Sequence, residues 1–507
     1  MFETIYKLQK PERKEPEMLK IGDKIKKEIS AEVVGSYDVV VCGGGTAGCA
    51  AAIAAARNGA RVVLLEASPF LGGMLTEGNA GLTNYVYNGK DAETQTKITQ
   101  RLFTVPESAQ VVGGIPLEFA HRLIKSGAAL GTAGTAGTYV YTDCQEFKIL
   151  LFEMMYEAGV EVFLHSPVCD VVVEESNITG VVTQTKLGRR VYLGKQFIDA
   201  TGDGDVAAFS GVPFVLGVGE EDAVYKQGLM KLGDQHAMGA MFRIGGVDFD
   251  RYVEYLKKHP EDFRPTRAGL MTLEDFLRAY DAGEMINGLG FTGSRWFQIY
   301  NYPKKGIMVG CLSMPDANAE GAGAHENRNG LEVREVTLSE YQVMIKAREI
   351  VVELKNSVPG FENAFVLDTP RAGIRETRHI VGEYRLNIVD VLNRVKFPDT
   401  IGKGSHPIDV HPVPAEVKNM AKPEEWSFDI PYRCMVPKNI DNLLVAGRCA
   451  SSTREGYGCI RPTAQCMVLG EAAGTAAAIL CKTCGVKAKD IDIVVLREQL
   501  KKQGVVL

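Results

Sequence analysis

The sequence has little of what marks membrane, secreted or nucleic-acid-binding proteins. The apolar runs that come nearest to a membrane span contain Arg57 or Glu471, so none reaches the roughly 18 residues required. The net charge of -6 leaves no excess of basic residues for nucleic acid or an anionic membrane. The N-terminus is rich in Lys and Glu and lacks the apolar core of a signal peptide. We therefore expect a cytoplasmic protein with neither a nucleic-acid partner nor a membrane partner.

The cysteines do not form a recognisable framework. The chain has 11 of them, an odd number, scattered through apolar segments, which is typical of reduced and buried thiols. Cys481 and Cys484 form a lone C-x-x-C, whereas a metal site usually needs a second pair. The spacing that iron–sulfur clusters require is also missing. We expect these two residues at a helix end and predict no metal site.

The strongest local signal begins at Tyr37. An apolar run stops abruptly at glycines, a small-residue stretch with helical character covers 49–58, and a second apolar run covers 61–65. This order predicts a strand, a tight turn, a helix and a second strand. With 45% apolar residues spread over 507 positions, the chain is long enough for two or three domains of this α/β class.

The turn carries the chemistry. Gly43, Gly45 and Gly48 occupy the three glycine positions of G-x-G-x-x-G. The first glycine permits the turn, the second lets the backbone approach a pyrophosphate, and the third lets helix and strand pack closely. The helix N-terminus would face the phosphates, and Glu66, 18 residues past Gly48, would hold ribose hydroxyls. We predict a dinucleotide site here; the alternative is a tight turn without a ligand.

Further elements follow from periodicity. We expect helices over 20–29, 117–125, 145–158, 249–258, 273–282, 338–355 and from Pro462 to about Cys481, and strands over 160–164, 168–174, 178–185, 189–193, 196–200, 295–302, 306–312 and 442–447. The glycine-rich stretch 131–137 is either a mobile loop over a site or a plain connector.

These elements predict a discontinuous Rossmann-like domain with an α+β insertion. The expected order is an N-terminal arm (1–35), a first nucleotide-binding part (36–85), a glycine-rich connector or lid (86–137), a second nucleotide-binding part (138–210), a substrate or cap domain (211–429), a third nucleotide-binding part (430–484) and a C-terminal tail helix (485–507).

Five separated motifs together resemble one known family. They are Val41–Gly48, Leu71–Thr76, Asp199–Asp205, Asn442–Arg448 and Gly458–Pro462. In this order and spacing they resemble FAD-dependent oxidoreductases with a glutathione-reductase-like flavin fold. More narrowly, they resemble the bacterial flavoprotein group that shares motifs with fumarate reductases. The resemblance covers residues 36 to 480 and implies FAD as the cofactor.

The resemblance also implies which residues hold FAD. The implied contacts are Gly43, Gly45, Thr46, Ala47 and Gly48 for the pyrophosphate, Glu66 and Ala67 for the adenosine ribose, Gly72, Gly73 and Met74 beside the pyrophosphate and flavin, Val168 for adenine, Ala200, Thr201 and Gly202 near the diphosphate, Gly447 and Arg448 for the ribityl chain or pyrophosphate, and Arg461, Thr463 and Ala464 where a helix points at the flavin O2 edge. Many relatives have Asp where Arg448 stands, which leaves that contact open. A second G-x-G-x-x-G in a βαβ unit is missing, so the electron partner is not visible.

The candidate catalytic residues lie between 371 and 411. This polar stretch contains Arg371, Arg375, Glu376, Arg378, His379, Tyr384 and Arg385, followed by His406, Asp409 and His411. We predict Arg378 as an anion clamp and His411, then His406, as the proton carrier, with Arg375 and Tyr384 completing the set.

Other interpretations of the same residues stay open. The arginine-rich stretch can be a solvated helix face, either histidine can be structural, and the His-x-x-Asp-x-His spacing can bind a metal. Cys459 can be a redox thiol, a flavin attachment point or a small packing residue.

Two function classes follow. The first is an FAD oxidoreductase that moves a hydride between flavin N5 and a small polar organic substrate. Reduction of a C=C bond or its reverse is favoured, and oxidation of an alcohol, including a sugar-type alcohol, comes next. The second is an electron-transfer flavoprotein subunit of a larger redox complex. A small-molecule substrate and an unidentified electron donor or acceptor are expected partners, and homo-oligomerisation is left open.

Overall fold

The computed structural model describes residues 24, 28–80, 82–83, 110–131, 139–236, 238–263, 272–281, 297–313, 328–368, 371–418, 426–483 and 487–507. The predicted helix over 20–29 and the glycine-rich stretch 131–137 fall almost entirely outside these residues. Cys484, half of the C-x-x-C pair, also lies outside them.

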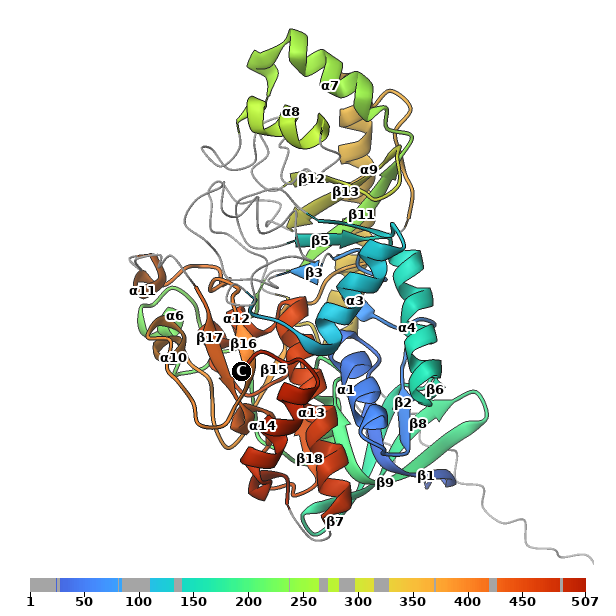
Figure 1. Cartoon of the computed structure of the whole chain (residues 1–507), viewed down its shortest axis with the longest axis vertical. Helices are drawn as coiled ribbons and strands as arrows, with labels where there is room; N and C mark the ends of the chain where they lie inside the picture. The colour runs from blue at the N-terminus through green and yellow to red at the C-terminus, as the bar shows by residue number, and fades with distance from the viewer. Residues whose placement is uncertain are drawn as a thin grey trace, which may run out of the picture.

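A seven-stranded sheet forms the centre of the first unit (Figure 1). Its order is β6-β2-β1-β9-β8-β7, and β18 also pairs with β9. The strands are β1 (Ala31–Cys42), β2 (Val62–Leu65), β6 (Glu161–Phe163), β7 (Val168–Glu174), β8 (Asn177–Thr185), β9 (Gly188–Asp199) and β18 (Leu443–Val445). The β6-β2-β1-β9-β18 part is parallel and the β9-β8-β7 part is antiparallel. The predicted α/β class is confirmed.

The apolar runs become strands because their side chains are buried on both faces of the sheet. Val39, Val40 and Val41 are each 0% exposed, as expected for a parallel sheet covered on both sides. Strand β1 begins at Ala31, so residues 31–35, which the sequence assigned to an arm, pair with β9 instead. Strand β9 is one continuous strand where the sequence predicted two.

Two small-residue helices cover one face of this sheet side by side (Figure 1). They are α1 (Thr46–Arg57) and α13 (Thr463–Lys482). A Cβ added at Gly470 would lie 2.0 Å from the Ala47 carbonyl oxygen, and one at Gly474 would lie 2.0 Å from the Ala51 carbonyl oxygen. The two backbones therefore touch, and this contact places the N-termini of both helices near the same edge of the sheet.

Helix α13 contains the apolar stretch that Glu471 interrupts in the sequence. It is the one helix among the described residues that is long and apolar enough, by length and composition, to cross a membrane. In the structure 89% of that stretch is buried, because it packs against α1 and the sheet.

The second unit lies above the first in Figure 1. Its sheet has the order β12-β13-β11-β14 and consists of β11 (Gly239–Gly245), β12 (Phe297–Asn301), β13 (Ile307–Ser313) and β14 (Phe365–Val366). Helices α7 (Phe249–Lys258), α8 (Leu273–Asp281) and α9 (Val333–Ser357) pack on it around a separate core. Tyr302 joins the units, since its hydroxyl donates to Asp143 Oδ1 (3.1 Å) and accepts from the Cys144 amide (3.0 Å).

The remaining elements connect or cover these units. They are η1 (Gly73–Leu75), β3 (Leu82–Thr83), α3 (Gly114–Lys125), β4 (Ala129–Gly131), β5 (Tyr139–Thr142), α4 (Cys144–Ala158), α5 (Asp205–Phe209), β10 (Phe214–Leu216), α6 (Ala223–Lys226), η3 (Pro260–Asp262), β15 (Arg378–Ile380), α10 (Ile388–Leu392), β16 (Thr400–Gly404), α11 (Ala415–Lys418), β17 (Phe428–Pro431), η4 (Tyr432–Met435), α12 (Arg454–Ile460), η5 (Ala488–Asp490) and α14 (Ile493–Lys502). Apolar residues between Leu386 and Phe428, predicted within the substrate domain, contribute to the core of the first unit.

Candidate active site

The three glycines of the first turn have three different environments. Gly43 has φ +95°, and an added Cβ would lie 2.4 Å from the Ala200 carbonyl oxygen. At Gly48 an added Cβ would lie 1.7 Å from the Gly43 carbonyl oxygen, whereas at Gly45 it would meet nothing within 4 Å. Gly45 is also the N-cap of α1 and provides no side-chain cap. The first and third glycines are therefore required by packing, and the second faces open space at a helix N-terminus.

The second glycine pair borders this space. Gly72 has φ +100° and donates its amide to the Gly44 carbonyl oxygen at 2.8 Å. A Cβ added at Gly73 would lie 3.2 Å from the Gly45 Cα, so the two turns adjoin. The Met74 side chain reaches the 373–376 segment, since a Cβ added at Gly373 would lie 3.0 Å from the Met74 Cε.

The acid that ends β2 also faces this edge. Glu66 accepts hydrogen bonds from the amides of Gly44 and Ser68, so its carboxylate is fixed beside the first turn. Its carbonyl accepts from the Ser166 amide at 2.8 Å, which brings the start of β7 at Val168 to the same edge. Ala67 lies between Glu66 and Ser68. The structure thus gathers the residues that the resemblance assigns to the pyrophosphate and the adenosine.

The third motif is held by a buried carboxylate. Asp199 accepts from the Thr201 amide (3.1 Å), the Thr201 hydroxyl (2.7 Å) and the Ala207 amide (2.9 Å). Burial raises the pKa of Asp199 to about 6. Gly202 follows with φ +82° and lies beside Arg448, where an added Cβ would be 3.1 Å from a guanidinium nitrogen.

Arg448 is engaged by protein groups. Its guanidinium donates to Asp203 Oδ1 at 2.6 Å and to the Thr377 hydroxyl at 3.0 Å. Gly447 has φ +90°, and an added Cβ there would lie 2.9 Å from the Ala47 Cβ at the start of α1. In the described structure the arginine that replaces the usual aspartate therefore forms an ion pair with Asp203, and the adjacent glycine provides the close approach.

The last motif ends in two helices. Pro462 is the N-cap of α13 and not its first helical residue, so the helix begins one residue later than the sequence predicted, and Pro462 has no side chain that can cap it. Thr463 and Ala464 begin that helix, and Arg461 precedes it with a side chain that is 14% exposed. Cys459 is fully buried in α12 and donates its thiol to the Glu455 carbonyl oxygen of the same helix at 3.7 Å, as a packing residue does.

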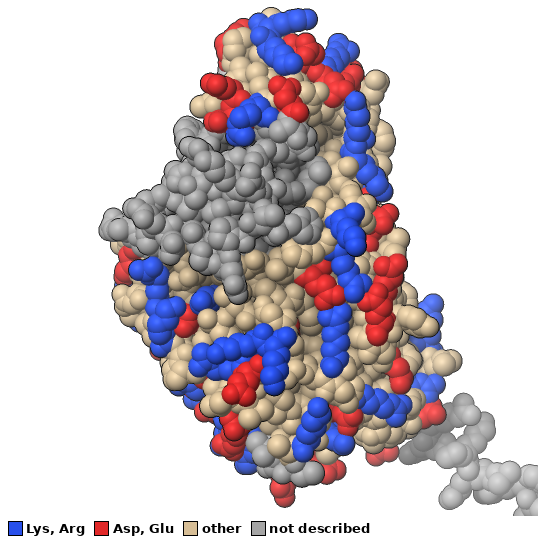
Figure 2. Space-filling model, viewed as in Figure 1, with Lys and Arg blue, Asp and Glu red and all other residues tan. Residues whose placement is uncertain are grey.

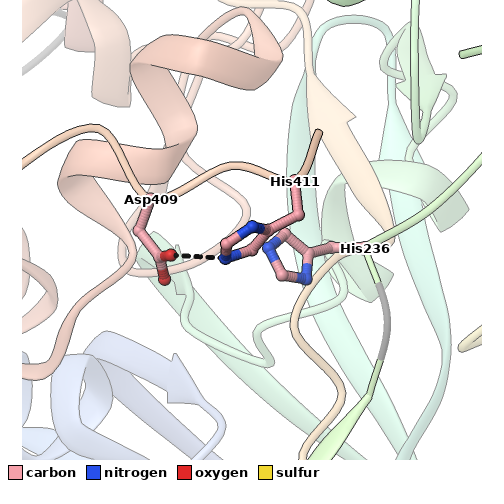
Figure 3. A group of neighbouring side chains, drawn as sticks. All are labelled: His236, Asp409 and His411. Atoms are coloured by element: carbon pink, nitrogen blue, oxygen red, sulfur yellow. Dashed lines mark ion pairs between the residues drawn. The ribbon is translucent and has the colours of Figure 1, made fainter. Parts of the chain in front are cut away.

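The structure brings two predicted residues together with one that was not predicted. His411 and Asp409 form an ion pair, with 3.3 Å between Nε2 and Oδ1, and the His236 ring meets the His411 ring edge-to-face at 5.3 Å (Figure 3). His236 is buried, and its backbone amide donates to Glu376 Oε2 at 2.6 Å. His411 remains 41% exposed, so a small molecule can reach its imidazole.

Arginines surround this group. Although burial raises the pKa of Asp409, Arg461 and the imidazoles of His411, His406 and His236 hold it well below its usual range. Burial, together with the charges of Arg375 and Arg461, holds the pKa of His236 well below its ordinary value. Asp409 therefore stays ionised and orients His411, and His236 stays neutral.

A fully buried ion pair between Glu376 and Arg454 contacts the backbone of His236 and His411. Glu376 Oε2 accepts from Arg454 Nε at 3.1 Å, and Glu376 Oε1 accepts from His379 Nε2 at 2.9 Å. Arg454 also donates to the His411 carbonyl oxygen at 3.1 Å. Glu376, His379 and Arg454 are each 1% exposed. A solvated helix face is therefore the wrong interpretation of this stretch, since it forms strand β15 and a buried network.

Two other predicted catalytic residues, Arg378 and Tyr384, bind protein groups other than His236, Asp409 and His411. Arg378 donates to Asp205 Oδ1 (2.8 Å) and to the Asp203 carbonyl oxygen (2.9 Å) and stacks on Phe214, because strand alternation directs it away from His379. Tyr384 donates to Asp390 Oδ2 at 2.8 Å beside α10. The anion-clamp role for Arg378 and a catalytic role for Tyr384 therefore find no support in these contacts.

His406 lies near Asp409 but outside the group of His236, Asp409 and His411. Its Nδ1 lies 2.6 Å from the Pro407 carbonyl oxygen, and burial lowers the pKa of its imidazole. It influences Asp409 electrostatically but does not join His236 and His411. Arg375, by contrast, lies close enough to both His236 and Arg461 to influence their charge states.

The side chains of His236, Asp409 and His411 also meet the spacing of a metal site, with their ligand atoms within 4.8 Å of one another. The ion pair of Arg461 with Asp409 and the nearby charge of Arg375 oppose a divalent cation there. An anionic or hydrogen-bonding ligand suits these charges better.

The sequence missed His236, Arg454 and Tyr457. His236 lies 173 residues from Asp409 and has no local signal. Arg454, Tyr457 and Arg461 recur at i, i+3 and i+7 and so share one helix face, which is a signal that was available.

The predicted residues fit FAD. The open space at Gly45 admits a pyrophosphate at the N-terminus of α1. Glu66 lies beside the same turn, where its carboxylate could bind ribose hydroxyls. The uncapped start of α13 adjoins Gly447, whose added Cβ would also approach Cys466 Sγ at 4.0 Å.

The chain is similar to several known proteins. The tRNA uridine 5-carboxymethylaminomethyl modification enzyme MnmG of Geotalea uraniireducens (strain Rf4) is 29% identical over 177 residues, which are 33% of this chain and 24% of that protein. The match therefore spans about a quarter of that relative. Among solved structures, p-nitrophenol 4-monooxygenase PnpA from Pseudomonas putida DLL-E4 is 12% identical, with 93% of this chain and 85% of that chain covered and a TM-score of 0.47.

A flavoprotein/dehydrogenase from Cytophaga hutchinsonii is also 12% identical, with coverage of 92% and 86% and a TM-score of 0.43. A family model with the description "FAD dependent oxidoreductase" matches residues 38–500, nearly the whole chain. The chain is therefore a member of the FAD dependent oxidoreductase family, an enzyme with FAD as its cofactor.

Proposed function

We propose that the enzyme transfers a hydride between flavin N5 and a small polar organic substrate, with His411 as the proton carrier. The observation that carries this proposal is the ion pair of the half-exposed His411 with the ionised Asp409, at 3.3 Å. When bound, FAD supplies the hydride acceptor or donor. The protein supplies the proton transfer, the orientation of the substrate and the electrostatic environment.

Asp409 fixes the imidazole in the same way as a carboxylate orients a catalytic histidine in other enzymes. Its second oxygen is bound by Arg461, so the carboxylate cannot turn away from His411. His236, held neutral by its surroundings, lies across the His411 ring and limits its rotation. His411 thus exchanges one proton with a substrate hydroxyl or carbon at a fixed position.

This arrangement serves two reactions. Oxidation of an alcohol removes a hydroxyl proton, and dehydrogenation next to a carbonyl removes a carbon-bound proton; both need a base beside the departing hydride. The excess of arginine near His411 favours dehydrogenation and its reverse, C=C reduction, because the charge that develops on the substrate is negative. An external electron donor or acceptor completes the cycle.

A tRNA-modifying role, which the name of the Geotalea uraniireducens relative suggests, is not favoured. The net charge is -6, and Lys, Arg, Asp and Glu are interspersed over the face shown in Figure 2 rather than gathered into a basic surface. An electron-transfer subunit also fits the cofactor. The Asp409–His411 pair argues against it, since electron transfer needs no proton carrier beside the substrate.

The test is anaerobic mixing of the purified yellow protein with single compounds. Reduction of the flavin by one small metabolite without a protein partner supports the proposal. Co-purification of a second redox protein, with no reduction by any small molecule, supports the electron-transfer subunit instead.

A further inference from the structure

Three buried donors line one face of α12 without an acceptor. Arg454 Nη1, the Tyr457 hydroxyl and Arg461 Nε have no hydrogen-bond partner among the residues that the structure describes. Arg454 and Tyr457 are each 1% exposed. Their spacing of i, i+3 and i+7 places the three side chains on one side of the helix. A buried donor without a partner is costly, so such groups in a folded protein indicate a ligand.

The three donors are close enough for the charges of Arg454 and Arg461 to act on Tyr457. Burial raises the pKa of the Tyr457 phenol, and the charges of Arg461 and Arg454 oppose this rise. The Arg461 guanidinium also lies 5.8 Å from the centre of the Tyr457 ring. The phenol therefore stays protonated and can donate a hydrogen bond.

The unpaired groups are all donors. Arg454 Nη1 and Arg461 Nε belong to guanidiniums, and the Tyr457 hydroxyl is the third donor. A ligand that accepts several hydrogen bonds satisfies these groups. A divalent cation accepts none, and an alcohol accepts fewer than a carboxylate.

We infer that this face of α12 binds a carboxylate of the substrate, so the substrate class is a small organic acid. Carboxylates offer about four acceptor positions and match the planar fork of arginine. Arg461 reaches both Asp409, which orients His411, and this face, so a bound carboxylate lies beside the proton carrier. The inference rests on the proposed function in one respect: the bound acid is the compound that exchanges the hydride.

The test uses the holoenzyme and its flavin spectrum. Glycolate, malonate and succinate are titrated anaerobically, each beside its uncharged amide. Perturbation of the flavin absorbance gives the dissociation constant, and bleaching reports reduction of the flavin. The variant is Tyr457→Phe, which removes only the unpaired hydroxyl. Its matched control is Tyr432→Phe, because Tyr432 is equally buried but donates its hydroxyl to the Ala488 carbonyl oxygen at 2.8 Å.

The expected result is that at least one carboxylate perturbs the flavin while its amide does not. Tyr457→Phe weakens that binding about tenfold or more, as expected when one of a few hydrogen bonds to a charged group is lost. The variant keeps the wild-type FAD content, and its Tm without the acid is equal to or above that of the wild type. Tyr432→Phe does the reverse: Tm falls and acid binding is unchanged.

Three results overturn the inference. One is that no acid perturbs the wild-type flavin, which decides the matter even if Tyr457→Phe fails to fold. Another is loss of FAD from Tyr457→Phe with unchanged acid binding, since the donors then serve the cofactor. The third is a stoichiometric divalent metal whose removal by EDTA abolishes acid binding, since the site then binds a cation.

The two proposals fail separately. Acid binding without flavin reduction by any compound contradicts the hydride-transfer function and leaves the carboxylate site intact. Flavin reduction by an uncharged alcohol, with no binding of the acids, contradicts the carboxylate site and leaves the hydride-transfer function intact.

Discussion

Glu471 is an ionisable residue in the middle of the apolar helix α13, and its replacement by Gln tests how the core is built. The side chain is 1% exposed, and its carboxylate accepts from the Ile115 amide at 2.9 Å and from Gln503 Nε2 at 3.1 Å. Burial raises the pKa of Glu471 from 4.5 to about 7. The folded protein therefore prefers the neutral acid, while the unfolded chain ionises it above about pH 4.5.

The sign and size of the effect follow from linkage. Because the folded-state pKa is raised, this contribution to stability is fully present below about pH 4.5 and is lost as the pH rises through about 7. At about 1.4 kcal/mol per pKa unit, the loss between pH 5 and pH 8 amounts to about 2–3 kcal/mol. Unfolding entropy grows with chain length, so for a chain of this size about 1 kcal/mol corresponds to about 1 °C in Tm.

The assay is thermal unfolding of wild type and Glu471→Gln at several pH values from 5 to 8. Gln cannot ionise, so the variant is expected to gain about 2–3 °C on the wild type between pH 5 and pH 8. Glu498→Gln, at an exposed position of α14, is the matched control and is expected to follow the wild type. If the difference in Tm between Glu471→Gln and wild type is the same at all pH values, the carboxyl does not titrate as a buried acid and this reasoning fails.

Further predictions concern the site. Gly45→Val should fold with wild-type far-ultraviolet circular dichroism and contain no FAD, because its side chain occupies the open space at α1; a yellow, stoichiometric variant refutes the cofactor placement. Gly48→Ala should fail to fold, since its Cβ overlaps the Gly43 carbonyl oxygen, and a stable variant contradicts that packing. His411→Ala should keep FAD and slow flavin reduction by substrate about 100-fold or more in stopped-flow measurements, while His259→Ala, at an exposed position, should not slow it. Arg378→Gln should lower Tm and leave the KM of the substrate within about twofold, since its guanidinium pairs with Asp205; a large rise in KM restores the anion clamp.

The nucleotide-binding turn was predictable because its requirements are local. Gly43 needs a positive φ, Gly48 needs the absence of a side chain, and Gly45 needs open space, and each requirement is met by residue type alone. The apolar runs that flank them form strands because both faces of the sheet are covered. The start of β1 at Ala31 was missed because Glu32 interrupts this short apolar stretch and Gly35 and Ser36 separate it from the buried run that follows.

The catalytic group was predictable only in part. Asp409 and His411 were identified because they are close in sequence, but His236 meets them only through the chain fold. Arg378 and His379 are neighbours that point in opposite directions, so the sequence could not tell which of them faces the site until β15 was known as a strand. The buried role of Glu376 was hidden for the same reason, since a charged residue is ordinarily expected at the surface.

If the proposed function is correct, a small organic acid alone reduces the flavin. The decisive measurement is an anaerobic absorbance scan of the purified enzyme against hydroxy acids and saturated acids, with uncharged alcohols and sugars beside them. The account predicts a protein that is yellow as purified and is bleached by at least one acid, at a rate that falls steeply in His411→Ala. A colourless protein that does not take up FAD, or a flavin that only dithionite reduces, would contradict it.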